Sequence, residues 1–276
     1  MKISVCVIGL NEEKRLADCL LSVKPIADEI VYVDSLSKDK SRTIAKQHGA
    51  RVINQKFLGH VQQKNLAVAK AKHDWILSLD CDERLSAEAL RSILAEKERR
   101  ARDPAAAEIT SYSFNRLTYY IYRWIRHSGW YPDKKIRLFH RKHAAWTGEN
   151  PHDRVENPAG KNLHLKGDIL HYSFNSISDH IKTIEAFSEI AAAEALRKGR
   201  RSGPFTIVFR SLWVGVRKML FEFAFLDGVA GLILTGLSIA ATWSKYSKLY
   251  ILQKQKADPD FLERNKIPVE KPAAKP

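Results

Sequence analysis

Cysteine is scarce in this chain of 276 residues, which contains only Cys6, Cys19 and Cys81. The number is odd and the three residues show no paired spacing, so the sequence indicates neither a disulfide framework nor a cysteine-based zinc site. A reduced, cytoplasmic environment fits this composition best.

Long uncharged segments are also rare. The chain enters an expected strand at Ile3, and Asn11, Glu12 and Glu13 interrupt any apolar region there, so no secretory signal is predicted. Further along, residues 228–243 are uncharged over 16 residues. This run is short of the ~20 residues that a membrane-spanning helix needs.

Acidic residues are too few to balance the basic ones. The chain has 46 Lys and Arg against 31 Asp and Glu, and its net charge of +15 predicts an anionic partner. The excess is concentrated in residues 197–256, where 11 basic residues stand against Glu222 and Asp227. Because this segment is also apolar, we expect in-plane or re-entrant helices on an anionic membrane surface rather than a full span. A helical hairpin buried in a soluble fold is the alternative.

Strand and helix patterns alternate in the first part of the chain. Short apolar runs predict strands, and amphipathic stripes between them predict helices. The expected strands are 3–10, 29–34, 50–53 and 74–79, and the expected helices are 12–23, 38–48 and 60–71. This alternation implies an α/β fold with a Rossmann-like, mostly parallel sheet that helices cover on both faces.

The remainder of the chain changes character twice. Residues 109–172 are rich in β-formers and aromatics, which predicts a mixed-sheet extension whose aromatics either line an acceptor pocket or are simply core. An Ala-rich helix is expected over 176–197, with a cap at Ser176 or Ser178. The proline-containing tail from Ala257 is expected to be disordered.

Acidic residues follow the fourth expected strand directly, at Asp80, Asp82 and Glu83. Ligands of open α/β sheets bind at the carboxyl ends of the strands, and carboxylates there suit a divalent cation on a phosphorylated substrate. The alternative is the acidic first turn of a helix that Ser86 caps.

Taken together, three segments resemble the inverting glycosyltransferases of family two, which have the GT-A fold. Residues 5–12 are similar to the family's opening strand and its Asn-Glu ending. Residues 34–41 are similar to its Asp-Ser-Gly-Ser-Thr-Asp-Gly-Thr loop, with Leu36 and Lys40 in place of glycines. Residues 80–82 stand where the family has its metal-binding Asp-X-Asp.

The resemblance extends to about residue 250 and points to one subgroup. Residues 135–139, 146–155, 169–173 and 225–228 are similar to a subgroup that includes the lipopolysaccharide core β-1,4-glucosyltransferases of Gram-negative bacteria. That subgroup often has Glu after the motif histidine, where this chain has Asp153. The resemblance implies a nucleotide-sugar-binding half at 1–105, an acceptor-binding half at 106–198, a membrane-associating helical segment at 199–256 and a tail at 257–276.

Roles for single residues follow from the same resemblance. Asp34 would meet the uracil ring, Asp80 would lie near the ribose, and Lys64 would face the nucleotide. The implied nucleotide-sugar-binding set is Gly9, Asn11, Glu12, Asp34, Lys64 and Asp80. As alternatives, Asp34 and Asp39 would only form an Asx-turn and a helix cap, and Lys64 would be a solvated helix residue.

Carboxylates supply the expected chemistry. Asp82, with Asp80 and His171, would hold Mg²⁺ or Mn²⁺ on the donor diphosphate, as the resemblance implies. Inversion needs one general base, and Asp153 is the expected base, with Glu149 as the alternative. A structural ion-pair cluster is the competing interpretation of these acids. Arg137 and Arg154 are expected either to meet phosphate or to form local salt bridges.

The sequence therefore predicts an inverting glycosyltransferase that moves a hexose, with UDP-glucose as the expected donor, onto a lipopolysaccharide inner-core or similar lipid-linked saccharide. It would act at the cytoplasmic face of the bacterial inner membrane. A related transferase acting on a polyprenyl-linked saccharide or a protein is the alternative within this class. Outside it stand an inactive membrane scaffold and a basic nucleic-acid-binding protein, although no nucleic acid is expected because no nucleic-acid-binding motif is present.

Overall fold

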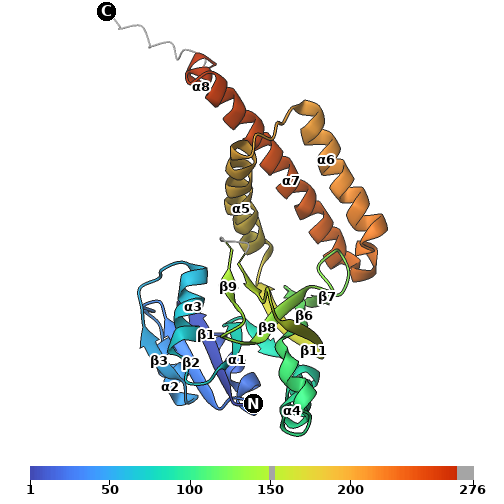
Figure 1. Cartoon of the computed structure of the whole chain (residues 1–276). Coiled ribbons are helices and arrows are strands. Elements are labelled where there is room, and N and C mark those ends of the chain that lie inside the picture. The colour runs from blue at the N-terminus through green and yellow to red at the C-terminus, as the bar shows by residue number, and fades with distance from the viewer. Residues whose placement is uncertain (149–152, 266–276) are drawn as a thin grey trace, which may run out of the picture. The chain divides into compact units, whose positions relative to one another are not determined.

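The computed structural model describes residues 1–148 and 153–265 (Figure 1). The chain forms two compact units, residues 1–175 and residues 176–276. Each unit is described below by itself.

A parallel sheet forms the first half of unit 1. Its strands lie in the order β3-β2-β1-β4, and helices connect them in the chain. The strands are β1 (Ile3–Gly9), β2 (Glu29–Asp34), β3 (Arg51–Asn54) and β4 (Trp75–Asp80), and the helices are α1 (Leu16–Val23), α2 (Ser41–Gln47) and α3 (His60–Lys70). The expected alternation of strands and helices is confirmed, with bounds that differ by at most four residues.

The second half of unit 1 continues the same sheet with mixed strand directions. Strand β8 pairs antiparallel with both β4 and β6, while β11 runs parallel to β6. The further strands are β5 (Glu83–Leu85), β6 (Ile109–Tyr120), β7 (Arg123–Ile125), β8 (Lys134–His140) and β11 (Lys161–Phe174). A separate antiparallel pair consists of β9 (Ala145–Thr147) and β10 (Arg154–Glu156). The result is a mixed, mostly parallel α/β sheet, as the sequence predicts.

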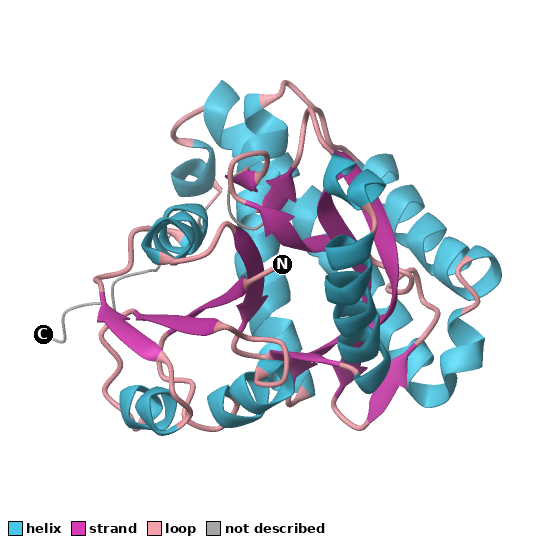
Figure 2. Cartoon of the chain, turned by 60° about the horizontal axis from the view of Figure 1, so that its bottom comes forward, coloured by secondary structure: helices cyan, strands magenta, loops and turns pink. Residues whose placement is uncertain are grey.

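Apolar side chains pack on both faces of this sheet, and Figure 2 shows helices beside its strands. On one face, Leu16 and Leu20 of α1 and Ile93 of α4 (Ala87–Arg102) pack with the strand residues of one cluster. On the other face, Ala67 and Val68 of α3 pack in a second cluster. The short helix η1 (Pro104–Glu108) leads from α4 into β6. Because helices cover both faces, the carboxyl edge of the strands is left for the site.

The structure has a short strand, β5, where the acidic first turn of a helix was the alternative from the sequence. Glu83 and Leu85 are buried, and β5 pairs antiparallel with β11. The helix begins only at Ala87, where the Ser86 hydroxyl accepts a hydrogen bond from the Ala89 N–H at 3.2 Å. The Ser86 cap is therefore confirmed, but Glu83 belongs to the sheet because its backbone pairs with β11.

Unit 2 is helical. It contains α5 (Ile177–Arg197), α6 (Pro204–Val216), η2 (Arg217–Phe221), η3 (Ala224–Asp227), α7 (Gly228–Ala257) and α8 (Phe261–Arg264). Helices α6 and α7 form an antiparallel hairpin (Figure 1), in which a Cβ on Gly215 would lie 2.9 Å from the Ile239 side chain.

Helix α5 falls in this unit, whereas we expected residues 176–198 to belong to the acceptor half. The reason is that Ala192 and Ala195 of α5 pack with Tyr246 and Leu249 of α7. In the expected tail, residues 261–264 form the short helix α8, and residues 266–276 lie outside the described part of the chain.

Candidate active site

The carboxyl ends of β1, β2 and β4 lie side by side. In the strand register Gly9 is opposite Asp34, and Ile8 is opposite Asp80. Gly9 is required by close approach, because a Cβ there would lie 2.6 Å from the Tyr32 hydroxyl. Residues of the predicted nucleotide-binding set that are far apart in sequence therefore meet at one edge.

Two loops with the family motifs are hydrogen-bonded to each other at this edge. The Asn11 N–H donates to the Ser37 hydroxyl at 2.9 Å, and the Asn11 side-chain oxygen accepts from the Lys38 N–H at 2.8 Å. The Glu12 N–H donates to the Ser41 hydroxyl at 2.8 Å. The loop after β1 and the loop after β2 thus form one wall of the site.

Asp34 is fully buried at the start of the second loop. Its carboxylate accepts from the Ser37 N–H at 2.8 Å and faces the Tyr32 hydroxyl at 3.4 Å. Asp34 therefore bonds the N–H three residues on and not two as an Asx-turn does, whereas Asp39 makes the two-residue bond, accepting from the Ser41 N–H at 3.0 Å. The contact of Asp34 with a base stays a prediction.

Successive side chains at the end of β4, from Asp80 to Asp82, point alternately toward the solvent and into the core. Cys81 is buried, and its thiol donates to the Ile8 carbonyl at 3.1 Å. Asp80 and Asp82 are partly exposed instead, and each has its own partner. The one-residue spacing therefore puts two carboxylates at the edge of the sheet and leaves the residue between them in the core.

Lys64 joins two of the predicted site residues. Its ammonium lies 3.0 Å from the Asp80 carboxylate and 2.8 Å from the Asp153 carboxylate. The side chain is buried and its nitrogen lies 4.0 Å from the centre of the Trp146 ring. Lys64 is thus not a solvated helix residue. The side chain of Asn65, the next residue of α3, bonds both the N–H and the carbonyl of Trp146.

The environment of Asp153 favours its ionised form. Burial opposes ionisation, but the hydrogen bond and charge of Lys64, together with His60 and Arg137, lower the pKa of the Asp153 carboxyl below its usual range. Asp153 is thereby a carboxylate at neutral pH. Glu149, the alternative base, lies outside the described residues.

Arg137 and Glu83 form a buried ion pair beneath the site. Two guanidinium nitrogens lie 2.8 and 3.2 Å from the Glu83 oxygens, and both residues are almost inaccessible to solvent. Burial opposes the charge of Glu83, but Arg137 more than offsets it and lowers the pKa of the carboxyl. Of the two expected outcomes for Arg137, the structure therefore shows the local salt bridge, and Arg154 likewise pairs with Glu156.

Asp82 and His171 form the second group of the site. The imidazole Nε2 lies 3.3 Å from the Asp82 carboxylate, and Nδ1 lies 3.4 Å from the Thr118 hydroxyl. Arg15, which the sequence analysis missed, approaches Asp82 at 3.8 Å. No motif signals it, because it simply lies one turn beyond the Asn-Glu segment.

The Asp82 carboxylate offers the oxygen ligand that Mg²⁺ and Mn²⁺ prefer, and the His171 imidazole nitrogen lies beside it. Within residues 1–148 and 153–265, however, no group of three His, Cys, Asp or Glu side chains is assembled for a metal. Asp80 is turned toward Lys64 instead. Asp82 and His171 could therefore hold a cation only if a ligand such as a diphosphate supplied further oxygens.

Residues 4–159 match the model of the family described as Glycosyl transferase family 2. An uncharacterized glycosyltransferase of Rickettsia prowazekii is 30% identical over 264 residues, which cover 90% of this chain and 86% of the relative. The lipopolysaccharide core biosynthesis glycosyltransferase LpsC of Rhizobium meliloti is 25% identical over 220 residues, which cover 76% of this chain and 77% of that protein.

The fold is also similar to that of a solved structure. The crystal structure of S. aureus TarS 1-349 in complex with UDP-GlcNAc aligns with a TM-score of 0.50 at 14% identity, and the match covers 94% of this chain and 92% of that chain. At this level of identity the likeness shows the fold alone.

Proposed function

The chain belongs to glycosyl transferase family 2 and is a nucleotide-sugar glycosyltransferase, and we propose that it transfers glucose, with inversion, from UDP-glucose to a lipopolysaccharide inner-core or similar lipid-linked saccharide. The observation that carries this proposal is the pair of carboxylates on Lys64. One, Asp80, ends a nucleotide-side strand, and the other, Asp153, lies in the acceptor-side motif. The residue proposed for the donor side and the residue proposed for the acceptor side thereby contact the same ammonium group.

On the donor side, the hydrogen-bonded loops at Asn11 and Ser37 would hold the nucleoside. Lys64 and Arg15 bring positive charge toward the place of the diphosphate. Asp82 and His171 are the proposed ligands of Mg²⁺ or Mn²⁺, which when bound neutralises charge on the diphosphate leaving group.

On the acceptor side, Asp153 is the proposed general base. Its carboxylate takes the proton of the attacking hydroxyl while that oxygen bonds to the anomeric carbon from the face opposite the diphosphate. The bond from the anomeric carbon to the phosphate oxygen breaks, and UDP leaves with the bonding electrons. One displacement inverts the anomeric configuration, so a single carboxylate is enough.

The proposed location is the cytoplasmic face of the inner membrane, and unit 2 supports it. Within the described residues one helical stretch, Ala224–Ala257, is long and apolar enough to cross a membrane by length and composition, and its apolar 18-residue window has a mean hydropathy of 1.8. Large apolar side chains are exposed along α6, the turn and the start of α7. They include Phe205, Phe209, Leu212, Trp213, Leu220, Phe221, Phe225, Val229 and Leu232.

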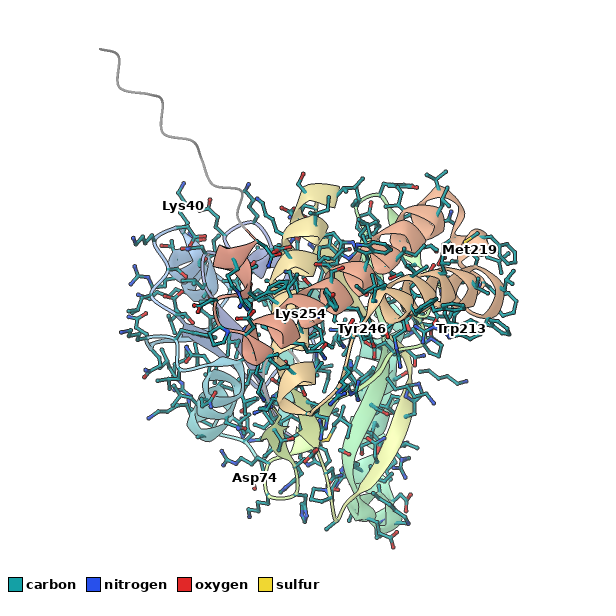
Figure 3. The ribbon with its side chains drawn as sticks, turned by 90° about the horizontal axis from the view of Figure 1, so that it is seen from above. Lys40, Asp74, Trp213, Met219, Tyr246 and Lys254 are labelled. Carbon is teal, nitrogen blue, oxygen red and sulfur yellow. The ribbon has the colours of Figure 1, made fainter. Side chains whose placement is uncertain are left out.

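Charge is distributed unevenly along this hairpin. At the turn, Arg217 and Lys218 pair with Glu222 at 3.0 and 3.2 Å, so these charges offset one another. The basic excess lies in the second half of α7, at Lys245, Lys248, Lys254 and Lys256. In Figure 3, Met219 marks the turn, and Tyr246 and Lys254 lie farther along α7. An apolar turn and a basic far end suit a re-entrant hairpin that enters an anionic leaflet.

The test is transfer by the purified full chain in vesicles. UDP-glucose, UDP-galactose, UDP-GlcNAc and GDP-mannose are each offered with truncated lipopolysaccharide acceptors, with Mn²⁺, with Mg²⁺ or with EDTA. We expect transfer from UDP-glucose that requires the metal and gives the inverted anomer by NMR. Full transfer in EDTA would contradict the metal proposal, and transfer from another donor alone would contradict the assignment of glucose.

A further inference from the structure

A pocket of about 410 Å³ opens in the mixed half of the sheet of unit 1. The end of β6, the segment that follows β7, and β11 form its walls. One wall is His171, whose Nε2 lies 3.3 Å from Asp82. The pocket therefore adjoins the proposed metal ligands but contains none of the loops that would hold the nucleoside.

Aromatic side chains form a firm apolar wall of this pocket. The Trp130 ring lies 5.7 Å from the Tyr120 ring, nearly perpendicular to it, and 6.3 Å from the Phe174 ring. Trp130 itself is half-buried and, with Phe174, lines the cavity. Ligand pockets combine such walls with a few fixed polar groups, and the apolar face of a sugar ring packs on an aromatic side chain held in this way.

Arg116 and Asp133 form an ion pair on the polar side of the pocket. Arg116 bonds Asp133 through two nitrogens at 2.9 and 3.0 Å, and the other Asp133 oxygen lies 3.0 Å from Lys135. The guanidinium and the carboxylate offer donors and acceptors next to each other, beside the Thr118 hydroxyl. Because the charge of Arg116 is matched within the pocket, this set suits hydroxyl groups better than a phosphate.

We propose that this pocket binds one neutral sugar unit of the saccharide acceptor, next to the unit that reacts. Trp130 is its stacking surface, and Arg116 and Asp133 bond its hydroxyls. The inference rests on the proposed function for the identity of the acceptor. It assigns a subsite to Trp130, Arg116 and Asp133, which lie outside the sequence motifs.

The experiment measures saccharide contact separately from turnover. Core oligosaccharides freed of lipid, with and without prior removal of phosphate by hydrofluoric acid, are mixed with the full chain, UDP and Mg²⁺, and contact is read by saturation-transfer NMR. Trp130→Ala should lose contact and raise the acceptor KM on the order of tenfold, which corresponds to about 1.4 kcal/mol. Trp130→Phe should recover most of both. Titration of UDP checks that each variant keeps its donor half.

The matched control is Tyr122→Ala, because Tyr122 is an exposed aromatic in the turn between β6 and β7 that does not line the pocket. Wild-type binding by Trp130→Ala would overturn the proposal. Loss of contact after phosphate removal would overturn the assignment of a neutral sugar. Absence of saccharide contact in a wild-type protein that turns over UDP-glucose would also overturn the pocket and leave the donor chemistry standing. Conversely, contact that depends on Trp130 without any transfer would refute the proposed function alone.

Discussion

A single lysine holds the two carboxylates on which the proposed reaction depends. Lys64 is buried between Asp80 and Asp153, with the Trp146 ring 4.0 Å from its nitrogen. A buried ammonium needs such partners, because the desolvation of an unpaired charge is costly. The two carboxylates therefore compensate the burial of the ammonium, and the lysine in turn lowers the pKa of the Asp153 carboxyl.

Replacement of Asp153 tests the base directly. Asp153→Asn keeps the shape of the side chain but cannot accept a proton, so transfer should fall by about 10²–10⁴-fold, whereas UDP binding by calorimetry should persist. Glu156→Gln is the matched control, because Glu156 is a partly exposed acid on β10. Full activity of Asp153→Asn together with loss in Glu149→Gln would move the base to Glu149.

A second prediction at this scale concerns stability. Glu96 accepts from Arg99 at 2.8 Å and from the Tyr112 hydroxyl at 2.5 Å. Burial raises its pKa, but these bonds more than offset burial and lower it. Glu96→Gln should therefore cost about 1.5–3 kcal/mol at pH 7, measured by urea unfolding. Glu98→Gln, whose pair with Arg102 is exposed, should change stability by less than about 0.5 kcal/mol.

The pH dependence of that difference follows from the sign of the shift. A lowered folded-state pKa contributes stability above the unfolded value of about 4.3. This contribution is lost as the pH falls through the folded pKa. The gap between wild type and Glu96→Gln should therefore be largest at neutral pH and shrink below about pH 4. A gap that widened in acid would contradict this account.

The sequence could indicate the chemistry of these residues but not all of their partners. Lys64, Asp80 and Asp153 follow from motif positions, and the structure brings them together. The pairing of Glu83 with Arg137 could not be predicted, because 54 residues separate them. Only the register of β4, β8 and β11 brings that carboxylate and guanidinium into contact.

At the scale of elements, the alternating apolar pattern was sufficient for β1 to β4 and their helices. It was insufficient for β5, a three-residue strand that is defined by pairing with β11 rather than by its own pattern. The hydrogen bonds between the loops after β1 and β2 were also not predictable, since each motif specifies one loop and not its partner. Local patterns predict elements, whereas long-range register determines how they meet.

Those loops give a prediction for donor binding. The Ser41 hydroxyl accepts from the Glu12 N–H at 2.8 Å and donates to Asp39 at 2.6 Å. Ser41→Ala leaves the Glu12 N–H without this partner, so stability should fall by about 1–3 kcal/mol and UDP should bind more weakly. Thr43→Ala, an exposed position on the same helix, is the control. Unchanged UDP affinity in Ser41→Ala would show that the loops do not depend on each other.

At the scale of the whole molecule, a mixed-sheet catalytic unit is joined to a helical unit with an apolar hairpin. Helix α7 has 30 residues, about 45 Å at 1.5 Å per residue. The uncharged run of 16 residues is only part of this helix, because the helix continues through Lys245 and Lys248. Lys245 and Lys248 therefore end the apolar part of the hairpin, but they do not end the helix.

Membrane binding should have two separable components. Substitution of Lys245, Lys248, Lys254 and Lys256 by Gln should weaken binding to phosphatidylglycerol vesicles at low salt, with about 1 kcal/mol for each charge near the surface. The difference should shrink in high salt, because ions screen surface charge. Carbonate washing should release a re-entrant hairpin from bacterial membranes. Retention of the chain in the carbonate-washed pellet would instead indicate a spanning helix.

The buried cysteines have a practical consequence for following the site. Cys6, Cys19 and Cys81 are all free and almost inaccessible to solvent, and burial raises the pKa of each thiol. A maleimide reagent therefore reacts only when the surrounding structure opens. Cys81 lies between Asp80 and Asp82, so its labelling rate measures how often that turn opens. The native thiol therefore reports the opening of this turn without an engineered probe. A bound nucleotide should lower the rate at which Cys81 is labelled.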